Sequence, residues 1–182
     1  MKKMMLAMFC MLCLSAQAQT SPAAKARVAE TRKAYAEAKK KIATAEQLQK
    51  EGKPSNMTVV NSNYALGNEQ GKVTTNYYYT CEEDTLLGRY FYEPFFIVNS
   101  YSAPGNIYYQ EFLFDKDLGL IFYYEKNNGK ETRFYFGKEG EVGDEGLVYE
   151  INTHYRVMEP TFACRVGGEL MNAFHYLMNR EF

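Results

Sequence analysis

The stretch LIFYYEKNNGKETRFYF, residues 120–136, carries the clearest structural signal in the chain. Two aromatic-rich runs, of the kind enriched in β-strands, flank Asn128-Gly129. This residue pair is favoured in two-residue type I′ hairpin turns, because both central positions require positive φ. The resulting antiparallel register places Asn127 opposite Lys130. It pairs Tyr123 with Phe134 and Ile121 with Phe136 on one face, and Phe122 with Tyr135 and Tyr124 with Arg133 on the other.

Outward from this hairpin, turn residues separate further strand-like segments. The predicted strands are 57–66, 72–81, 86–101 with an interruption near Pro94, 106–115, 118–126 and 131–137. Aromatic triplets beginning at residues 90, 112 and 134 stand 22 residues apart, a spacing of two strands plus two turns that favours a meander. Strands are also predicted near 147–157 and 161–166.

A long N-terminal helix is predicted over residues 22–51. Pro22 suits the first helical position, and Gly52 and Pro54 end the helix. The residues Val28, Tyr35 and Ile42 recur every seven positions, with Ala24, Thr31, Ala38 and Ala45 between them, which gives a narrow apolar stripe. Such a helix is about 45 Å long, whereas an eight-residue strand reaches about 26 Å. We therefore expect that the sheet does not accommodate the whole helix unless it crosses diagonally. The alternative is that the stripe pairs with a second copy in a weak homodimer.

A short C-terminal helix is predicted after Gly167-Gly168. Its apolar face consists of Leu170, Met171, Phe174, Leu177 and Met178. The predicted fold is therefore α+β: an antiparallel β-meander of six to eight strands with a long N-terminal helix and a short C-terminal helix. The 182-residue chain is expected to have three parts: a signal peptide at 1–18, a basic helical segment at 19–53, and an aromatic-rich sheet domain with the C-terminal helix at 54–182.

Residues 1–18 have the features of a secretory signal peptide. Lys2 and Lys3 precede an apolar run at 4–14, and Ala16-Gln17-Ala18 forms a small-x-small cleavage site. An apolar run of this length is about half of the ~20 residues that span a bilayer, so no transmembrane segment is expected in the mature chain. No cysteine follows a small residue at the cleavage site. We therefore expect a periplasmic or extracellular protein without a lipid anchor.

Cleavage after Ala18 would remove Cys10 and Cys13 and leave Cys81 and Cys164. An even pair in an oxidising compartment predicts a disulfide, with two buried free thiols as the alternative. His154 and His175 are the only histidines, and these four residues lack the close spacings of a zinc site. The sequence thus predicts neither a metal site nor a cofactor.

No motif for catalysis is present. The histidines have no nucleophile signature nearby, and Asp115-Lys116-Asp117-Leu118-Gly119 resembles a hairpin turn more than a calcium loop. The acidic residues at 139–145 indicate a solvated loop, and no Gly-rich phosphate loop or dinucleotide fingerprint occurs. The full chain has a net charge of −1, and the chain without Lys2 and Lys3 has −3, divided into +5 for 19–53 and −8 for 54–182. This balance provides no global basic field for nucleic acid.

The aromatic surplus, 16 Tyr and 12 Phe without Trp, is the one feature that indicates a binding surface. Either two helices cover both faces of the sheet, or one tyrosine-rich face remains open to a protein or glycan partner. The candidate residues for such a face are Tyr77, Tyr78, Tyr79, Tyr108, Tyr109, Tyr124 and Tyr135. The favoured interpretation is a non-catalytic binding or assembly module. The alternative is a hydrolase acting on envelope or extracellular polymers through paired carboxylates.

The signal peptide, the Lys/Ala-rich helix and aromatic hairpins such as 112–124 and 131–136 together resemble small exported proteins of unknown function from Bacteroidetes-type Gram-negative bacteria. The resemblance extends over most of the mature chain in its general pattern and transfers no functional residue. It implies a bacterial envelope or extracellular setting.

Overall fold

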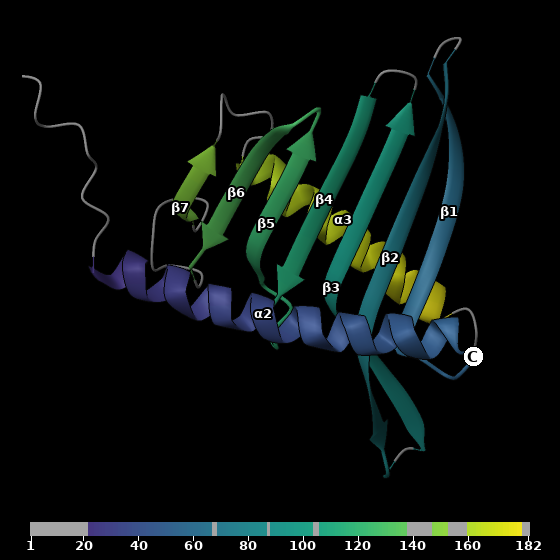
Figure 1. Ribbon diagram of the computed structural model, residues 1–182. Helices are drawn as coiled ribbons and strands as arrows, with labels where there is room; N and C mark the ends of the chain where they lie inside the picture. The colour runs from purple at the N-terminus through teal and green to yellow at the C-terminus, as the bar shows by residue number, and fades with distance from the viewer. Residues whose placement is uncertain are drawn as a thin grey trace, which may run out of the picture.

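The computed structural model describes residues 22–66, 69–86, 88–103, 106–137, 147–152 and 160–179. Its strands form one antiparallel sheet in the order β1-β2-β3-β4-β5-β6-β7, so every strand pairs with its neighbours in the chain. Helix α2 (Pro22–Lys50) crosses one face of the sheet and helix α3 (Pro160–Met178) crosses the other (Figure 1). The strands are β1 (Met57–Leu66), β2 (Glu69–Asp84), β3 (Arg89–Ala103), β4 (Asn106–Phe114), β5 (Leu120–Asn127), β6 (Lys130–Phe136) and β7 (Leu147–Asn152). The predicted α+β meander is confirmed.

The β5–β6 hairpin has the predicted turn and most of the predicted register. Asn128 and Gly129 have φ of 47° and 82°, and the observed pairs include Tyr123 with Phe134, Phe122 with Tyr135 and Tyr124 with Arg133. The pairing expected for Ile121 is wrong, because β5 contains a bulge there: Leu113 of β4 pairs with Phe122, and Phe114 pairs with Leu120. Ile121 thus joins the core on the α2 face, whereas Phe136 belongs to the core on the α3 face.

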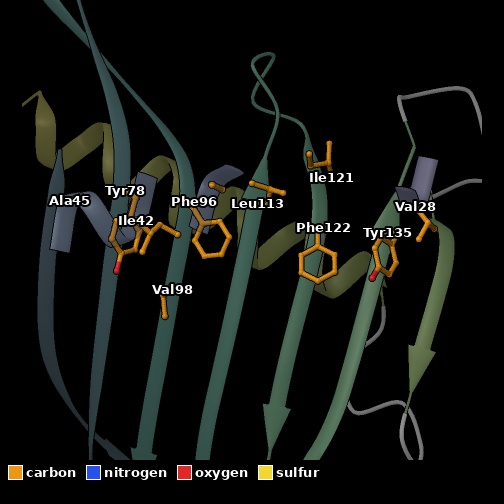
Figure 2. Packing of buried hydrophobic residues seen from close by; sticks show 11 residues of the cluster. Val28, Ile42, Ala45, Tyr78, Phe96, Val98, Leu113, Ile121, Phe122 and Tyr135 are labelled. Carbon is orange, nitrogen blue, oxygen red and sulfur yellow. The ribbon is translucent and has the colours of Figure 1, made fainter. Parts of the chain in front are cut away.

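Helix α2 packs on the sheet through the predicted narrow stripe. Val28, Ala38, Ile42 and Ala45 contact a row of large residues drawn from successive strands, Tyr78, Phe96, Leu113, Phe122 and Tyr135. Figure 2 shows this row as a band across the strands, with Val28 near Tyr135 at one end and Ile42 near Tyr78 at the other. The stripe is therefore occupied by its own sheet, and a homodimer through it would require α2 to leave this position.

Helix α2 runs across the strands rather than along them, so the width of the sheet, and not the length of one strand, is the distance to compare with the helix (Figure 1). Six gaps between seven strands make the sheet about 29 Å wide. The buried residues of α2 extend from Ala24 to Ala45, a length of about 32 Å at 1.5 Å per residue. The width of the sheet thus determines how much of the helix is buried.

Helix α3 begins earlier than predicted, at Pro160, and continues through Gly167-Gly168. The strand predicted at 161–166 and the break at the two glycines are therefore wrong. The reason is tertiary packing: Ala163, Gly167, Met171 and Phe174 form one buried face. A Cβ atom on Gly167 would lie 3.3 Å from Cδ1 of Phe112, so the glycine lets the helix approach the sheet closely. No helix in the described part of the chain is both long and apolar enough to cross a membrane.

No disulfide joins Cys81, which is exposed, to Cys164, which is partly buried, so the predicted disulfide is wrong. Cys81 lies on β2 just beyond Tyr79, whose ring is 5.3 Å from that of Phe174 in α3. Cys164 precedes Phe174 by ten residues, about 15 Å along the helix. The Cα atoms of a disulfide lie within about 7 Å of each other. The two cysteines are therefore too far apart to form a disulfide.

The two glycines of α3 form a matched test of this packing. We expect Gly168→Ala to raise the free energy of unfolding by about 0.5–1 kcal/mol, since nothing lies within 4 Å of its added Cβ and alanine favours helix. Gly167→Ala should lose this gain, and Gly167→Leu should cost about 1–3 kcal/mol because Phe112 is fully buried. Urea unfolding measures both. Equal stabilisation by the two alanine variants would contradict the close approach of helix and sheet.

Candidate functional site

A buried carboxylate joins α2 to the centre of the sheet. Glu111 of β4 is only 3% exposed. It accepts hydrogen bonds from the Tyr35 hydroxyl at 2.6 Å and the Lys39 ammonium at 2.9 Å, both on α2, and from the Tyr109 hydroxyl at 2.6 Å. A buried carboxylate is tolerated only when such donors surround it. The bonds of Glu111 therefore fix the position and rotation of α2 on the sheet.

The tyrosine hydroxyls around Glu111 keep their protons. Burial raises the pKa of Tyr35 and of Tyr109, and the hydrogen bond to the Glu111 carboxylate raises both further. A second bond of this type joins Tyr78 of β2 to Glu46 of α2 at 2.7 Å, and burial again raises the pKa of the tyrosine. These groups therefore act as hydrogen-bond donors to carboxylates, and not as bases, at neutral pH.

Next to the Glu111 cluster, the sheet and α2 enclose a hollow of about 460 Å³. Its floor is a block of two cross-strand pairs from the β5–β6 hairpin, Phe122 with Tyr135 and Tyr124 with Arg133. Its wall is Thr31, Arg32 and Tyr35, which lie within about one turn of α2. The hairpin and the stripe that determine the fold therefore also form the hollow.

The hollow is aromatic and cationic. The guanidinium of Arg133 lies 5.1 Å from the centre of the Tyr124 ring, and that of Arg32 lies 6.0 Å from the centre of the Tyr135 ring. Arg133 also binds Glu131 at 2.6 Å. Burial, followed by the Glu131 carboxylate, raises the pKa of Tyr124 to about 12, so this hydroxyl is also protonated at neutral pH. Among the described residues that line the hollow, two are cations and none is an anion.

The structure distributes the candidate tyrosines over both faces and buries several of them. Tyr78 and Tyr135 are buried in the core under α2, and Tyr109 and Tyr124 pack against its border. Tyr77 and Tyr79 contact Phe174 of α3 on the opposite face. Tyr108 packs edge-to-face on Tyr101, with the ring centres 5.5 Å apart. The candidates therefore do not form one continuous face, and only Tyr124 and Tyr135 meet in the hollow.

The α3 face contains a second buried carboxylate within a polar row. Thr75, Asn99, Gln110, Glu125 and Thr132 lie directly opposite one another on β2 to β6. Glu125 is 2% exposed and accepts a 2.6 Å hydrogen bond from the Tyr123 hydroxyl. Because Glu111 and Glu125 lie on opposite faces of the sheet, they do not flank a common substrate as the two carboxylates of a glycosidase do.

Other candidate positions have ordinary structural roles. Asp115 closes the β4–β5 turn by accepting hydrogen bonds from the backbone amides of Asp117 and Gly119, which explains the acidic pattern there. His175 packs on Phe174 in α3. The described residues contain no cluster of three or more histidine, cysteine or acidic side chains placed to hold a metal ion. The predicted signal peptide at 1–18, His154 and the acidic segment 139–145 lie outside the described residues.

No protein-family model, curated protein or solved structure matches this chain. The geometry of the hollow is therefore the basis for its functional interpretation.

Sequence reasoning did not nominate Glu111, Arg133, Arg32 or Lys39. One signal for Glu111 was available: it is the only charged residue in the run YYQEFLF, in which Gln110 is the only other residue that is neither aromatic nor apolar. Alternation along the strand places it on the same side as Leu113, so a charge is directed into the core and requires donors. The arginines carried no such signal, because they meet only when α2 crosses the hairpin.

The tyrosine–carboxylate contacts should make the protein sensitive to alkali. An unfolded tyrosine loses its proton near pH 10, whereas the folded pKa of Tyr109 is raised, so the unfolded state binds fewer protons above that pH. We expect the free energy of unfolding to fall above pH 10, by about 1 kcal/mol per such tyrosine up to pH 11. Urea unfolding from pH 8 to 11 measures the slope.

Tyr109→Phe should reduce the alkaline slope, while costing about 1–3 kcal/mol at pH 8 through the lost bond to Glu111. The control is Tyr90→Phe, since Tyr90 is 55% exposed. An unchanged slope in Tyr109→Phe would show that this hydroxyl does not contribute to the alkaline effect.

Proposed function

We propose that this protein is an exported, non-catalytic binding module that holds a small ligand in the hollow between α2 and the β5–β6 hairpin. The observation that carries the proposal is the composition of the hollow: a floor of two aromatic-containing cross-strand pairs, a wall from one helix, and two guanidinium groups. Ligand sites combine apolar ring surface with a few polar groups in this way. The binding surface is thus a concave site rather than a broad tyrosine face.

Binding fits these residues better than hydrolysis. A hydrolase needs a general acid and a base or nucleophile beside the substrate. The lining residues supply tyrosines, arginines, one phenylalanine and one threonine. Burial raises the pKa of Tyr35 and Tyr124, which leaves both hydroxyls protonated, and Glu111 is surrounded by three donors. These features support recognition of a ligand without its chemical conversion.

Export is the second part of the proposal, and the sequence of residues 1–18 supports it. The positive start, the short apolar run and Ala16-Gln17-Ala18 are the elements of a cleavable signal peptide. The resemblance to small exported proteins of Bacteroidetes-type bacteria supports a periplasmic or extracellular location in the envelope of such a cell. The partner would then be a small molecule, or an exposed group of a protein or glycan, in that compartment.

The proposed export is tested by intact mass spectrometry of the protein recovered from the periplasm or medium of a Gram-negative host. We expect a mature chain that begins at Gln19 and carries no acyl group. An Ala18→Arg variant should accumulate as the uncleaved precursor, because the cleavage site requires a small residue. Full-length protein confined to the cytoplasm, or a lipid-modified chain beginning at Cys10 or Cys13, would contradict the proposal.

Binding is tested by screening a fragment library that contains equal numbers of anionic, neutral and cationic compounds. The readout is the change in the backbone amide NMR signals of the protein. We expect bound fragments to shift signals of residues 31–35, 122–124 and 133–135, and to leave those of 163–174 in α3 unchanged. Tyr124→Leu, which removes a floor ring, should weaken binding at least tenfold. Tyr101→Leu is the matched control, since Tyr101 is also half-buried and has an aromatic neighbour, but lies on the other face. A library without any fragment that shifts these signals would overturn the proposal.

A further inference from the structure

We infer that the ligand of the hollow is a small organic anion in which a carboxylate is attached to a ring, with the carboxylate bound by Arg133 and Arg32 and the ring packed on Tyr124 and Tyr135. This inference rests on the proposed function and specifies its ligand. Four observations support it: the charge of the lining, the geometry of Arg133, two buried polar groups without partners, and the size of the hollow.

The charge of the lining favours an anion. Arg32 lies on the helix wall and Arg133 lies on the sheet floor, so the two guanidinium groups come from different elements and face the same space. Glu131 pairs with Arg133, and Glu111 is bound to Lys39. Neither carboxylate lines the hollow. A cation entering it would meet two like charges beside the aromatic surface, whereas a carboxylate would be attracted by both.

Arg133 is oriented for carboxylate recognition. Its guanidinium is held at two points, by the 2.6 Å bond of Nη2 to Glu131 and by the Tyr124 ring 5.1 Å from Cζ. A guanidinium has five N–H donors in a rigid plane, so one bond to Glu131 leaves donors for a second carboxylate. Because the group is already ordered, binding loses less side-chain entropy than it would at a mobile arginine.

Two buried polar groups on α2 have no hydrogen-bond partner. Thr31 is 1% exposed and lines the hollow, and its hydroxyl has no hydrogen-bond partner. One turn earlier on α2, Arg27 donates to the Phe136 carbonyl and to Glu30, but its Nη2 has no partner. Buried polar groups are normally satisfied, and those that are not call for an explanation. Of the two residues, Thr31 lines the hollow, so its hydroxyl can donate to an anion there, whereas Arg27 lies one turn away along the same helix.

The size of the hollow restricts the ligand. A volume of about 460 Å³ lies near the lower end of the ~300–1,000 Å³ that is usual for small-molecule sites. It accommodates one or two rings and their substituents. The Phe122 and Tyr135 rings, 5.1 Å apart, provide apolar surface beneath the arginines. A planar aromatic acid and an acidic sugar both present a ring face and a carboxylate, so this shared chemistry defines the ligand class.

The test is titration of the full mature chain with four probes. Calorimetry measures the affinity, and the amide NMR signals of the residues lining the hollow show where each probe binds. Benzoate and benzamide share a ring and differ in charge, as do methyl glucuronide and methyl glucoside. We expect the charged member of at least one pair to bind at least tenfold more tightly than its neutral partner, and to weaken as ionic strength rises. Preference for benzoate identifies an aromatic acid, and preference for methyl glucuronide identifies an acidic sugar.

Arg133→Gln should reduce the affinity for the preferred anion at least tenfold. Arg32→Gln should do the same, and because Arg32 is exposed, this substitution should leave the fold intact. Arg165→Gln is the matched control: Arg165 also binds a glutamate, Glu169 at 2.9 Å, and lies 4.5 Å from the Phe162 ring, but it is on α3. Equal binding of charged and neutral probes at the hollow, or unchanged affinity in both hollow variants, would overturn the inference and leave the binding module intact. If no probe and no library fragment binds the hollow, the proposed function fails as well.

Discussion

The bonds made by Glu111 determine where α2 lies, and the arrangement of the α2 face depends on them. A carboxylate that is 3% exposed must have donors, and two of its three donors come from the helix. The apolar stripe alone would tolerate sliding, because it consists largely of small residues that make few specific contacts. The carboxylate removes this freedom, since only one position of α2 brings both Tyr35 and Lys39 to Glu111. The wall of the hollow is placed by the same contact.

The aromatic surplus follows from covering a wide sheet with one helix on each face. Large rings fill the row of residues beneath each helix, where Phe96, Phe112, Tyr123 and Phe134 are completely buried. In the next row, which a helix covers only in part, tyrosine replaces phenylalanine, as at Tyr109 and Tyr124. A tyrosine can bury its ring while its hydroxyl meets a carboxylate or water. Tyrosine therefore suits positions at the border of the core, such as Tyr109 and Tyr124.

Local patterns predicted most of the fold, and long-range contacts explain the remainder. The Asn128-Gly129 turn, the limits of β1 and the start of α2 follow from propensity and residue period alone. Helix α3 was mispredicted because Gly167 breaks a helix by propensity but favours close packing on Phe112. The Ile121 bulge and the separation of the thiols depend on neighbouring strands and on the direction of α3. Of the residues that line the candidate site, the sequence singled out Tyr35, Tyr124 and Tyr135. It did not indicate Arg32 and Arg133, because these two residues are about a hundred positions apart in the chain and meet only in the folded structure.

The direction in which α2 crosses the sheet has a consequence for the order of folding. Each strand pairs with the strand made just before it, so the sheet can grow from β1 to β7 as the chain emerges. Helix α2 is synthesised before any strand, yet Arg27 near its start binds the carbonyl of Phe136, 109 residues later. Helix α2 is thus unable to dock completely until β6 is in place. The hollow between α2 and the β5–β6 hairpin can therefore form only after most of the sheet has been made.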